Sequence, residues 1–565
     1  MNSWRENQAT TAGNPEPPHS LATLFIQQGK LREAEEYFRQ PLSSLLSPAE
    51  QPTHPGTLKK LPGELGTAAE EYRETVTLQP QGSDYHFNLA TVLHKQGALQ
   101  EAAACYKKAL ALRPDDFEAH YSLGVTYHRM GNLAAAAPAY VRALQINPNC
   151  AEAYTNLGAL CQELGDLRTA AGLQRQALAL APAMPEAYVN LGVVLSQLND
   201  CHGAVTCFLQ ALTKDPGHAG AHCNLGFVLE KQGDLEGAQR CYRQALACKP
   251  DSDEARFYLG VTHLLQGDYA NGWQEYEARW GTKEFRRFRR TFSQPLWRGQ
   301  PLPGARILLH AEQGLGDTIQ FVRFVPLVAA RGGQVVLEVQ PELRRLLANF
   351  PGVSCTITRG ETPPEFTWHC PLMSLPLAFG TQLTNIPAAI PYLRADAARV
   401  QTYSGRVERQ GLRIGLAWAG NPTHSRERQR SITLAQLEPL TRIAGTTFYS
   451  LQRGAAASQI RGLPSIKLSE LDSQGKDFAD TAALVANLDL VISVDTATAH
   501  LAGALGKPVW ILLHHMPDWR WLQQGATSLW YPTARLFRQT TPGDWRPVID
   551  SVRAELERAA RQFHR

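Results

Sequence analysis

The chain has 565 residues, more than the roughly 250–300 at which a single hydrophobic core stops growing, so we expect several domains or a repeat array. Its composition, 44% hydrophobic and 19% charged, is that of a soluble globular protein and excludes a disordered, collagen-like or coiled-coil chain. A formal net charge of +4 is too small to favour bulk binding to nucleic acid or to an anionic membrane, and we expect neither partner.

No membrane span or secretory signal is evident in the sequence. It contains no run of the roughly 18–20 apolar residues that cross a bilayer, and its first twenty residues lack the apolar core of a signal peptide. The ten cysteines include no CxxC pair and no metal-finger spacing. We therefore expect a cytoplasmic protein with reduced cysteines and no bound metal.

A period of 34 residues runs through the first half of the chain. Prolines keep this spacing at Pro80, Pro114, Pro148, Pro182, Pro216 and Pro250. Small residues recur in the same register, as at Gly124 and Gly158, and so do turn glycines such as Gly131 and Gly165. A small residue allows two helices to approach, a glycine suits the turn between them, and a proline ends the second helix. The unit predicted is a helix–turn–helix.

This pattern resembles the tetratricopeptide repeat, and the resemblance implies an α-helical superhelix that holds a peptide or protein in its groove. We expect the superhelix over 83–282. The same register extends backward through 15–82 as degenerate repeats, and 1–14 is expected to be a disordered N-terminus.

One polar column recurs at the sixth position of the repeat, formed by Asn88, Asn156, Asn190 and Asn224. An amide offers both a donor and an acceptor, and asparagine is a poor residue for the middle of a helix, which favours a role in binding a peptide backbone. The column is similar to the asparagine ladder of eukaryotic protein O-linked N-acetylglucosamine transferases. The alternative is that these are ordinary exposed polar residues.

Residues 283–305 are predicted to be a linker. This segment carries tryptophan at Trp297 and a basic cluster that includes Arg286 and Arg290. A basic-aromatic cluster can bind nucleic acid, but one such run in a nearly neutral chain is weak support for that function. We favour docking of the repeat array on the next domain.

From residue 306 the pattern changes to short apolar strands that alternate with helices. One run of this kind covers 306–400 and a second covers 412–565, and each predicts a parallel sheet flanked by helices. We expect two Rossmann-like lobes, with 385–411 as the crossover and the closing helix, about 546–565, packed across both lobes. Ligands of such folds bind at the carboxyl ends of the strands.

The first motif at a strand end is HAEQGLGD, which contains Gly314, Gly316 and Asp317. Its glycines allow a tight loop that exposes backbone amides to an anion. Asp317 starts a helix, and we consider two functions for it, a general base at the cleft and a simple helix cap.

The second motif is SVDTATAHLAGALGKP, in which a strand again leads into a helix. Asp495, Thr496, Thr498 and His500 lie at the start of that helix, where unpaired backbone amides can hold a diphosphate. The two hydroxyls add donors, and His500 offers a ring nitrogen.

The third motif is the loop WAGNPTHSRERQRSI, with Asn421, Arg428 and Arg430 as candidate phosphate ligands. The alternative is a solvated basic loop. Further along, Asp518 and Trp519 follow another strand end, where they border a nucleotide or serve interlobe packing.

Together the three motifs over 306–540 resemble the heptosyltransferase-like glycosyltransferases, whose GT-B architecture has two facing Rossmann-like lobes. The resemblance implies that Asp317 deprotonates the acceptor hydroxyl. It also implies that Asp495, Thr496 and His500 cradle the nucleotide diphosphate, with Arg428 or Arg430 assisting its departure. The first lobe, which would be the acceptor side, is short for this family, so the repeats are expected to supply acceptor surface.

We therefore expect a metal-independent glycosyltransferase that uses a nucleotide sugar as donor and has no other cofactor. Its repeat array would recruit a protein or other acceptor. The alternative is a tetratricopeptide scaffold for protein–protein interaction with a degenerate, non-catalytic glycosyltransferase-like domain, because a fold does not guarantee a function. The sequence does not identify the sugar, the acceptor, the stereochemical outcome or the oligomeric state.

Overall fold

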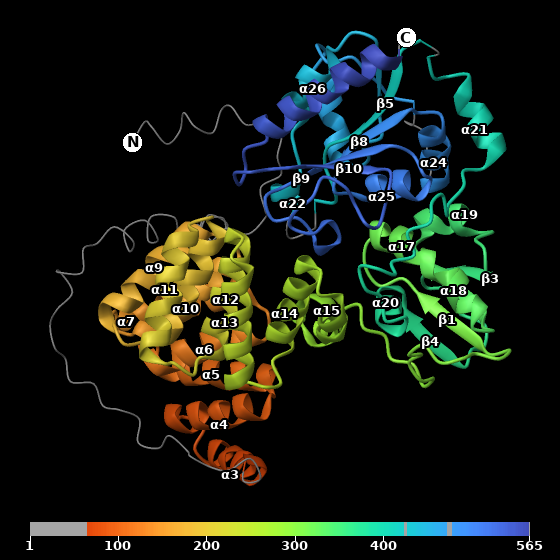
Figure 1. Cartoon of the computed structure of the whole chain (residues 1–565). Coiled ribbons are helices and arrows are strands. Elements are labelled where there is room, and N and C mark those ends of the chain that lie inside the picture. Colours follow the sequence, from red (N-terminus) through yellow and green to blue (C-terminus); the bar gives the residue numbers. More distant parts are fainter. Residues whose placement is uncertain (1–64, 409, 423–426, 472–476, 564–565) are drawn as a thin grey trace. The chain divides into compact units, whose positions relative to one another are not determined.

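The computed structural model describes residues 65–408, 410–422, 427–471 and 477–563 (Figure 1). The predicted disordered segment 1–14 and the repeats predicted over 15–64 lie outside these described residues. The chain divides after Val228 into two compact units.

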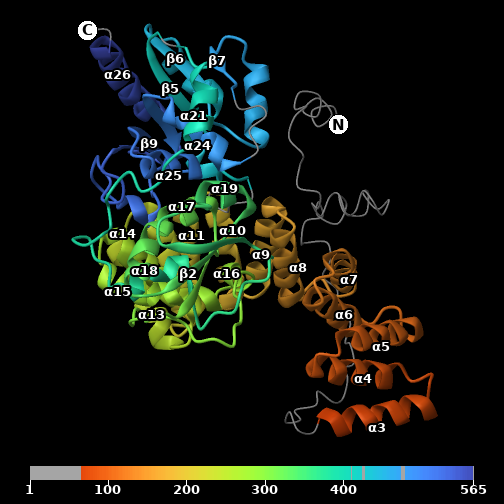
Figure 2. The same ribbon diagram turned by 90° about the vertical axis from the view of Figure 1, so that its right-hand side faces the viewer.

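The first unit is a series of antiparallel helix pairs, and Figure 2 shows its first helices stacked one after another. The helices are α3 (Leu65–Leu78), α4 (Ser83–Gln96), α5 (Leu99–Leu112), α6 (Phe117–Arg129), α7 (Leu133–Ile146), α8 (Ala151–Glu163), α9 (Leu167–Leu180), α10 (Pro185–Gln197), α11 (Cys201–Lys214) and α12 (Ala219–Gln232), whose last residues belong to the second unit. Successive repeats begin at equivalent residues, which confirms the predicted helix–turn–helix period. Helix α3 lies within the segment 15–82 that the sequence assigns to degenerate repeats.

The small-residue column has the packing function that the sequence predicted. A Cβ atom at Gly124 would lie 2.7 Å from the ring of Tyr140, and one at Gly158 would lie 2.5 Å from the amide nitrogen of Gln174. In these repeats the small residue of the first helix therefore leaves room for a large side chain from the second. Asn199 replaces glycine in one turn and adopts φ 64°, a left-handed conformation that asparagine tolerates better than most residues.

The second unit begins with the last helices of the array and continues into a first α/β lobe. Its helical start comprises α13 (Leu235–Cys248), α14 (Asp253–Gln266), α15 (Tyr269–Tyr276), the 3-10 helix η4 (Glu277–Gly281) and α16 (Lys283–Arg286). The lobe contains β1 (Arg306–His310), α17 (Leu315–Phe321), η5 (Val322–Phe324), α18 (Val325–Ala330), β2 (Gln334–Val339), η6 (Pro341–Leu343), α19 (Arg344–Leu347), β3 (Val353–Thr358), β4 (Trp368–Pro371), η7 (Leu372–Ser374) and α20 (Leu375–Ala378). Its strands are parallel in the order β3-β2-β1-β4.

A second lobe follows the connecting helix α21 (Ala397–Ser404). It contains β5 (Leu412–Ala417), α22 (Glu427–Arg430), η8 (Leu434–Leu437), α23 (Glu438–Thr441), β6 (Thr446–Ser450), η9 (Ala455–Gly462), β7 (Leu468–Ser469), α24 (Phe478–Ala486), β8 (Leu490–Val494), α25 (Ala497–Ala504), β9 (Val509–Leu513), η10 (Trp519–Trp521), β10 (Ala534–Arg538) and α26 (Arg546–Phe563). The parallel order is β10-β9-β8-β5-β6-β7. Strand order reverses between β1 and β4 in the first sheet and between β5 and β8 in the second. Such switch points are where ligands of doubly wound folds bind.

The closing helix does not pack across both lobes as predicted. Val548, Val552 and Leu556 of α26 lie in a hydrophobic core with Leu412 and Ile414 of β5. This helix has one apolar face, and most of its buried residues pack in the core of the second lobe.

The last helix pair of the array is part of the α/β unit. Trp273 on α15 is 2% exposed, and its indole N–H donates a 3.1 Å hydrogen bond to the carbonyl of Thr381. The indole N–H of Trp530 in turn donates a 3.0 Å hydrogen bond to the hydroxyl of Tyr269. One hydrophobic core includes Tyr269, Trp273, the first sheet and Trp530. The compact units therefore do not coincide with the predicted boundary at 282.

The predicted linker 283–305 also packs on the first lobe. The backbone N–H of Trp297 donates to the carbonyl of His369 at 2.8 Å, and the Trp297 side chain is buried. Arg290, from the basic cluster, forms an ion pair with the buried Glu338 on β2. This segment serves docking, which the sequence favoured over nucleic-acid binding. Among the helices of the described residues, none combines the length and apolar character needed to cross a membrane.

This packing predicts where the protein can be cut. A fragment of residues 215–565 should unfold cooperatively. A fragment of 283–565 lacks Tyr269 and Trp273, and its free energy of unfolding should be lower by at least about 3–5 kcal/mol, the usual cost of removing one buried aromatic side chain. Denaturant unfolding followed by circular dichroism measures the difference. Equal stability of the two fragments would show that the last helix pair contributes nothing to the α/β unit.

Candidate functional site

The candidate site forms where helices α17 and α25 meet. Each helix follows a strand that borders a switch point, β1 in the first sheet and β8 in the second. A Cβ atom at Gly316 would lie 2.8 Å from Cδ2 of His500 and 3.4 Å from Cα of Ala497. Only glycine fits this approach without displacing its neighbours, so the glycine of the first motif allows contact with the histidine of the second.

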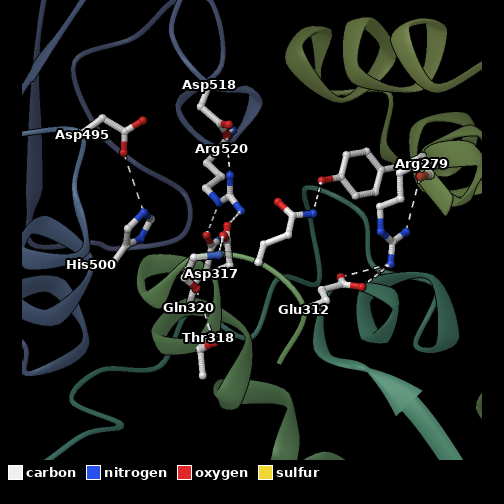
Figure 3. Close-up of polar contacts among 12 residues, drawn as sticks. Arg279, Glu312, Asp317, Thr318, Gln320, Asp495, His500, Asp518 and Arg520 are labelled. Carbon is white, nitrogen blue, oxygen red and sulfur yellow. Dashed lines mark hydrogen bonds and ion pairs between the residues drawn. The ribbon is translucent and has the colours of Figure 1, made fainter. Parts of the chain in front are cut away.

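Asp317 is the third residue of α17, and both of its carboxylate oxygens accept hydrogen bonds. Its Oδ2 accepts the backbone N–H of Gly314 at 2.8 Å, which caps the helix. Its Oδ1 accepts a hydrogen bond from Nη2 of Arg520, which belongs to the second lobe (Figure 3). The capping function proposed for Asp317 is therefore present in the structure, and its function as a base stays a prediction.

Arg520 is a site residue that the sequence reasoning missed. Its Nη1 donates to Asp518 at 2.8 Å, and its Nε donates to the side-chain oxygen of Gln320 on α17. The guanidinium carbon lies 4.5 Å from the ring centre of Trp519. The signal was an arginine between two tryptophans after a strand end, but the sequence does not show that its partners lie in the other lobe.

His500 is held in one orientation by three neighbours. Its Nδ1 lies 2.9 Å from the hydroxyl of Tyr531, its ring stacks on Trp521 with a centroid separation of 5.4 Å, and its Nε2 lies 3.8 Å from Oδ1 of Asp495. Burial, assisted by the positive charge of Arg520, lowers the pKa of His500 well below its ordinary value. The ring is therefore neutral at physiological pH.

The same surroundings raise the pKa of Asp495, whereas they lower that of His500. Burial, together with the nearby Asp518 carboxylate, raises the pKa of Asp495 to about 6. Arg430 and Arg520 oppose this rise. The start of α25 therefore carries a carboxyl group that ionises near neutral pH, next to several arginines.

The other predicted ligands differ in how close they come to this centre. Thr496 is the N-cap residue of α25, and its hydroxyl lies 2.9 Å from that of Ser493. Thr498 is 8% exposed in the first turn of the helix, while Asn421 lies in the exposed turn after β5. Arg430 lowers the pKa of His500 and is half-buried. The side chain predicted at Arg428 lies outside the described residues.

The loop before α17 is also fixed by the end of the repeat array. Arg279, on η4, is fully buried, and its Nη2 donates to both carboxylate oxygens of Glu312 at 3.1 and 3.2 Å (Figure 3). The side-chain amide of Gln313 donates to the hydroxyl of Tyr276 at 3.3 Å. Burial raises the pKa of Glu312 to about 7 despite the opposing effect of Arg279.

Within the part of the chain that the structure describes, three of the four predicted peptide ligands in the array have no side-chain hydrogen-bond partner. Asn88, Asn190 and Asn224 occupy the sixth residue of α4, α10 and α12, are half-buried, and form no side-chain hydrogen bond with any described residue. Asn156 differs, because its amide donates to the hydroxyl of Tyr121 at 2.9 Å. In the described parts of the chain, no group of three or more histidine, cysteine, aspartate or glutamate side chains is arranged to hold a metal.

Comparison with known families identifies the helical part of the chain. Tetratricopeptide repeat models match residues 117–150, 155–219, 207–240 and 228–280, and a TPR repeat model matches 92–131. The N-terminal region is therefore an array of tetratricopeptide repeats that forms a helical superhelix, and the region after it contains parallel sheets with interspersed helices.

Protein FlbA of Caulobacter vibrioides is 29% identical to this chain over 315 residues, which are 51% of the chain. The chain spans about half, 52%, of the length of that curated relative. Among solved structures, YrrB, described as a TPR protein with an unusual peptide-binding site, is 25% identical with a TM-score of 0.29 and matches 33% of this chain and 97% of its own. MamA is 24% identical with a TM-score of 0.27 and matches 29% of this chain and 95% of its own.

The buried pair Arg279 and Glu312 predicts a pH-dependent loss of stability in Arg279→Met. Because its pKa is raised in the folded state, Glu312 favours folding most below its unfolded value of about 4.5, and this contribution is lost as pH rises through about 7. Without Arg279 the ionised carboxylate of Glu312 has lost this partner. The free energy of unfolding of the variant should therefore fall by about 3–5 kcal/mol at pH 8 and by clearly less at pH 5.

Urea unfolding of the wild type, Arg279→Met and the double variant Arg279→Met/Glu312→Gln at both pH values measures this effect. The double variant should recover most of the stability at pH 8, since it removes the fully buried carboxylate, and the other partner of Arg279, Glu277, is 24% exposed and can be solvated. A loss in Arg279→Met that is the same at both pH values would rule out the uncompensated carboxylate as its cause.

Proposed function

We propose that the chain is a glycosyltransferase of GT-B architecture that moves a sugar from a nucleotide sugar to an acceptor hydroxyl. One observation carries the proposal. The helices that follow the switch-point strands of two parallel sheets meet at Gly316 and His500, beside Asp317 and Arg520. A carboxylate from one lobe and an anion-binding helix start from the other are the parts that such a transfer needs.

The surroundings of α25 support a diphosphate as the ligand. Burial lowers the pKa of His500 most, and Arg520, Arg323 and Arg430 add to this effect while Asp518 opposes it, so three arginines lie near the start of this helix. Unpaired backbone N–H groups at a helix start and nearby arginines favour a phosphate group. Thr498 and the neutral His500 ring add groups that can hydrogen-bond to its oxygens.

In the proposed reaction Asp317 accepts the proton of the acceptor hydroxyl, and that oxygen forms a bond to the anomeric carbon. The bond from this carbon to the donor phosphate breaks, and the diphosphate leaves with the electron pair. The start of α25 and the neighbouring arginines then stabilise the charge on the leaving group, which is a function that needs no metal.

The repeat array is proposed to recruit a protein acceptor through the asparagine column. Asn88, Asn190 and Asn224 have their amides available at equivalent positions of three repeats, as a ligand with a repeating backbone requires. Recruitment of a protein acceptor and the cytoplasmic location stay predictions.

A second function is favoured by the state of Asp317. Its two oxygens already accept hydrogen bonds from Gly314 and Arg520, an arrangement that a purely structural aspartate would also show. In this case the chain is a tetratricopeptide scaffold whose α/β part has lost catalysis.

A thermal-shift titration of the full chain with nucleoside diphosphates and their sugars separates the two functions. One nucleotide should raise the melting temperature, because a ligand that binds only the folded state stabilises it by about 2.7 kcal/mol at a hundred times its Kd. His500→Ala should abolish this rise. With that donor, Asp317→Asn should still bind the nucleotide but lose sugar transfer by at least about 100-fold, which is a typical contribution of a general base.

The matched control is Arg399→Gln, which removes an ion pair to Asp480 away from the α17 and α25 contact. It should bind the nucleotide as the wild type does. If no nucleotide shifts the melting temperature of the wild type at millimolar concentration, the scaffold function is correct. Unchanged transfer by Asp317→Asn would remove Asp317 from the mechanism.

The asparagine column makes a prediction of its own. The double variant Asn190→Ala/Asn224→Ala should reduce capture of the protein acceptor by about 10-fold, at about 0.5–1.5 kcal/mol for each lost hydrogen bond, and leave donor hydrolysis unchanged. The control Gln210→Ala/Gln244→Ala removes two exposed amides from the second helices of neighbouring repeats. Equal weakening by both double variants would show that the asparagines have no special function.

A further inference from the structure

The guanidinium of Arg520 lies between two aspartates, Asp317 of the first lobe and Asp518 of its own loop. On one side it donates to Asp317 and Gln320 of the first lobe, and on the other it donates to Asp518 of its own loop (Figure 3). Its side chain is 8% exposed. Its guanidinium is positively charged, because an arginine remains protonated in proteins. Arg520 is therefore a fixed positive charge at the contact between α17 and α25.

Asp518 binds both the backbone and the guanidinium of Arg520. One oxygen of Asp518 accepts both the backbone N–H of Arg520 at 3.1 Å and its Nη1 at 2.8 Å. The second terminal nitrogen, Nη2, bonds to Asp317, and Nε bonds to Gln320. The group can therefore exchange its partner at Nη2 while Asp518 continues to hold it.

The field of Arg520 also reaches the start of α25. It contributes to lowering the pKa of His500, and it opposes the rise in the pKa of Asp495. A diphosphate held at the start of α25 would bring two or more negative charges into this range. Guanidinium groups bind phosphate oxygens strongly through paired N–H donors, so a diphosphate competes with the single Asp317 carboxylate for Nη2.

We propose that Arg520 exchanges Asp317 for the donor diphosphate, and that this exchange activates the site. This inference rests on the proposed glycosyltransferase function. In the structure Nη2 of Arg520 donates to Oδ1 of Asp317, the oxygen that is not used to cap α17. When the donor binds, Nη2 of Arg520 bonds to a phosphate oxygen of the donor instead. Oδ1 of Asp317 is then free to accept the proton of the acceptor hydroxyl.

The exchange gives Arg520 two functions in one reaction. It stabilises the negative charge that develops as the bond between the anomeric carbon and the phosphate oxygen breaks. It also prevents Asp317 from acting as a base before the donor is present, which orders donor binding before deprotonation of the acceptor. The proton goes to Oδ1 of Asp317, and the electron pair of the broken bond goes to the diphosphate.

Competition between Asp317 and a diphosphate has a consequence with a definite sign. If the two compete for Arg520, removing the charge of Asp317 must strengthen diphosphate binding. If the ion pair only holds the lobes together, the same change will weaken binding or leave it unaltered. A tighter affinity excludes a purely structural ion pair, and its dependence on Arg520 separates competition from the simple loss of charge repulsion.

The test is calorimetric titration of the full chain with inorganic pyrophosphate. Asp317→Asn should bind pyrophosphate about 5-fold or more tightly than the wild type, within the usual range of coupling between two sites. Arg520→Gln should bind about 10-fold or more weakly, and Arg520→Lys, which keeps the charge but not the paired donors, should fall between them. In Asp317→Asn/Arg520→Gln the gain should disappear, because no guanidinium remains to be released.

The matched control is Arg345→Gln, which removes an ion pair to Asp477 and Asp480 between the lobes but does not touch α25. Its affinity for pyrophosphate should remain that of the wild type. If the wild type binds pyrophosphate and transfers sugar, but Asp317→Asn does not bind more tightly, the exchange is wrong and the proposed function stands. If the wild type binds neither pyrophosphate nor any nucleoside diphosphate, both are wrong.

Discussion

The close approach of Gly316 to His500 is the constraint on which the candidate site depends. A side chain at residue 316 would have to occupy the space of the imidazole ring, so the first turn of α17 could not reach that of α25. With glycine there, Asp317 comes within reach of Arg520, and the start of α25 faces a carboxylate from the other lobe. The absence of a Cβ atom at Gly316 thus allows contact between two motifs that are far apart in the chain.

The end of the repeat array reaches the same loop from another direction. Arg279 and Tyr276 bind Glu312 and Gln313, the two residues that precede the glycines of the first motif. A buried ion pair of this kind is costly to break from one side, so the loop and the last helix pair are held together. If the array binds an acceptor protein, the element that ends it is also the one that supports the proposed base.

The sequence identified most of the candidate site but missed its central cation. Asp317, Asp495 and His500 stand at strand ends followed by helices, a pattern that is visible without a structure. Arg520 lies in a loop with no such pattern, and its importance comes from partners in the other lobe. In the same way, the position of Arg279 in a basic and aromatic stretch gave no sign that it is fully buried against Glu312.

What the sequence determined by itself was local in origin. Helix pairs recur every 34 residues because turn residues, small residues and prolines act within one repeat. The alternation of strands and helices likewise depends on the pattern of residues in short stretches of chain. Only the tertiary structure decided that the last helix pair joins the α/β unit, that α26 covers the second lobe alone, and that Arg520 binds Asp317. These outcomes depend on which surfaces are buried together and which charges meet there. Such pairings link residues distant in sequence, and no periodic pattern encodes them.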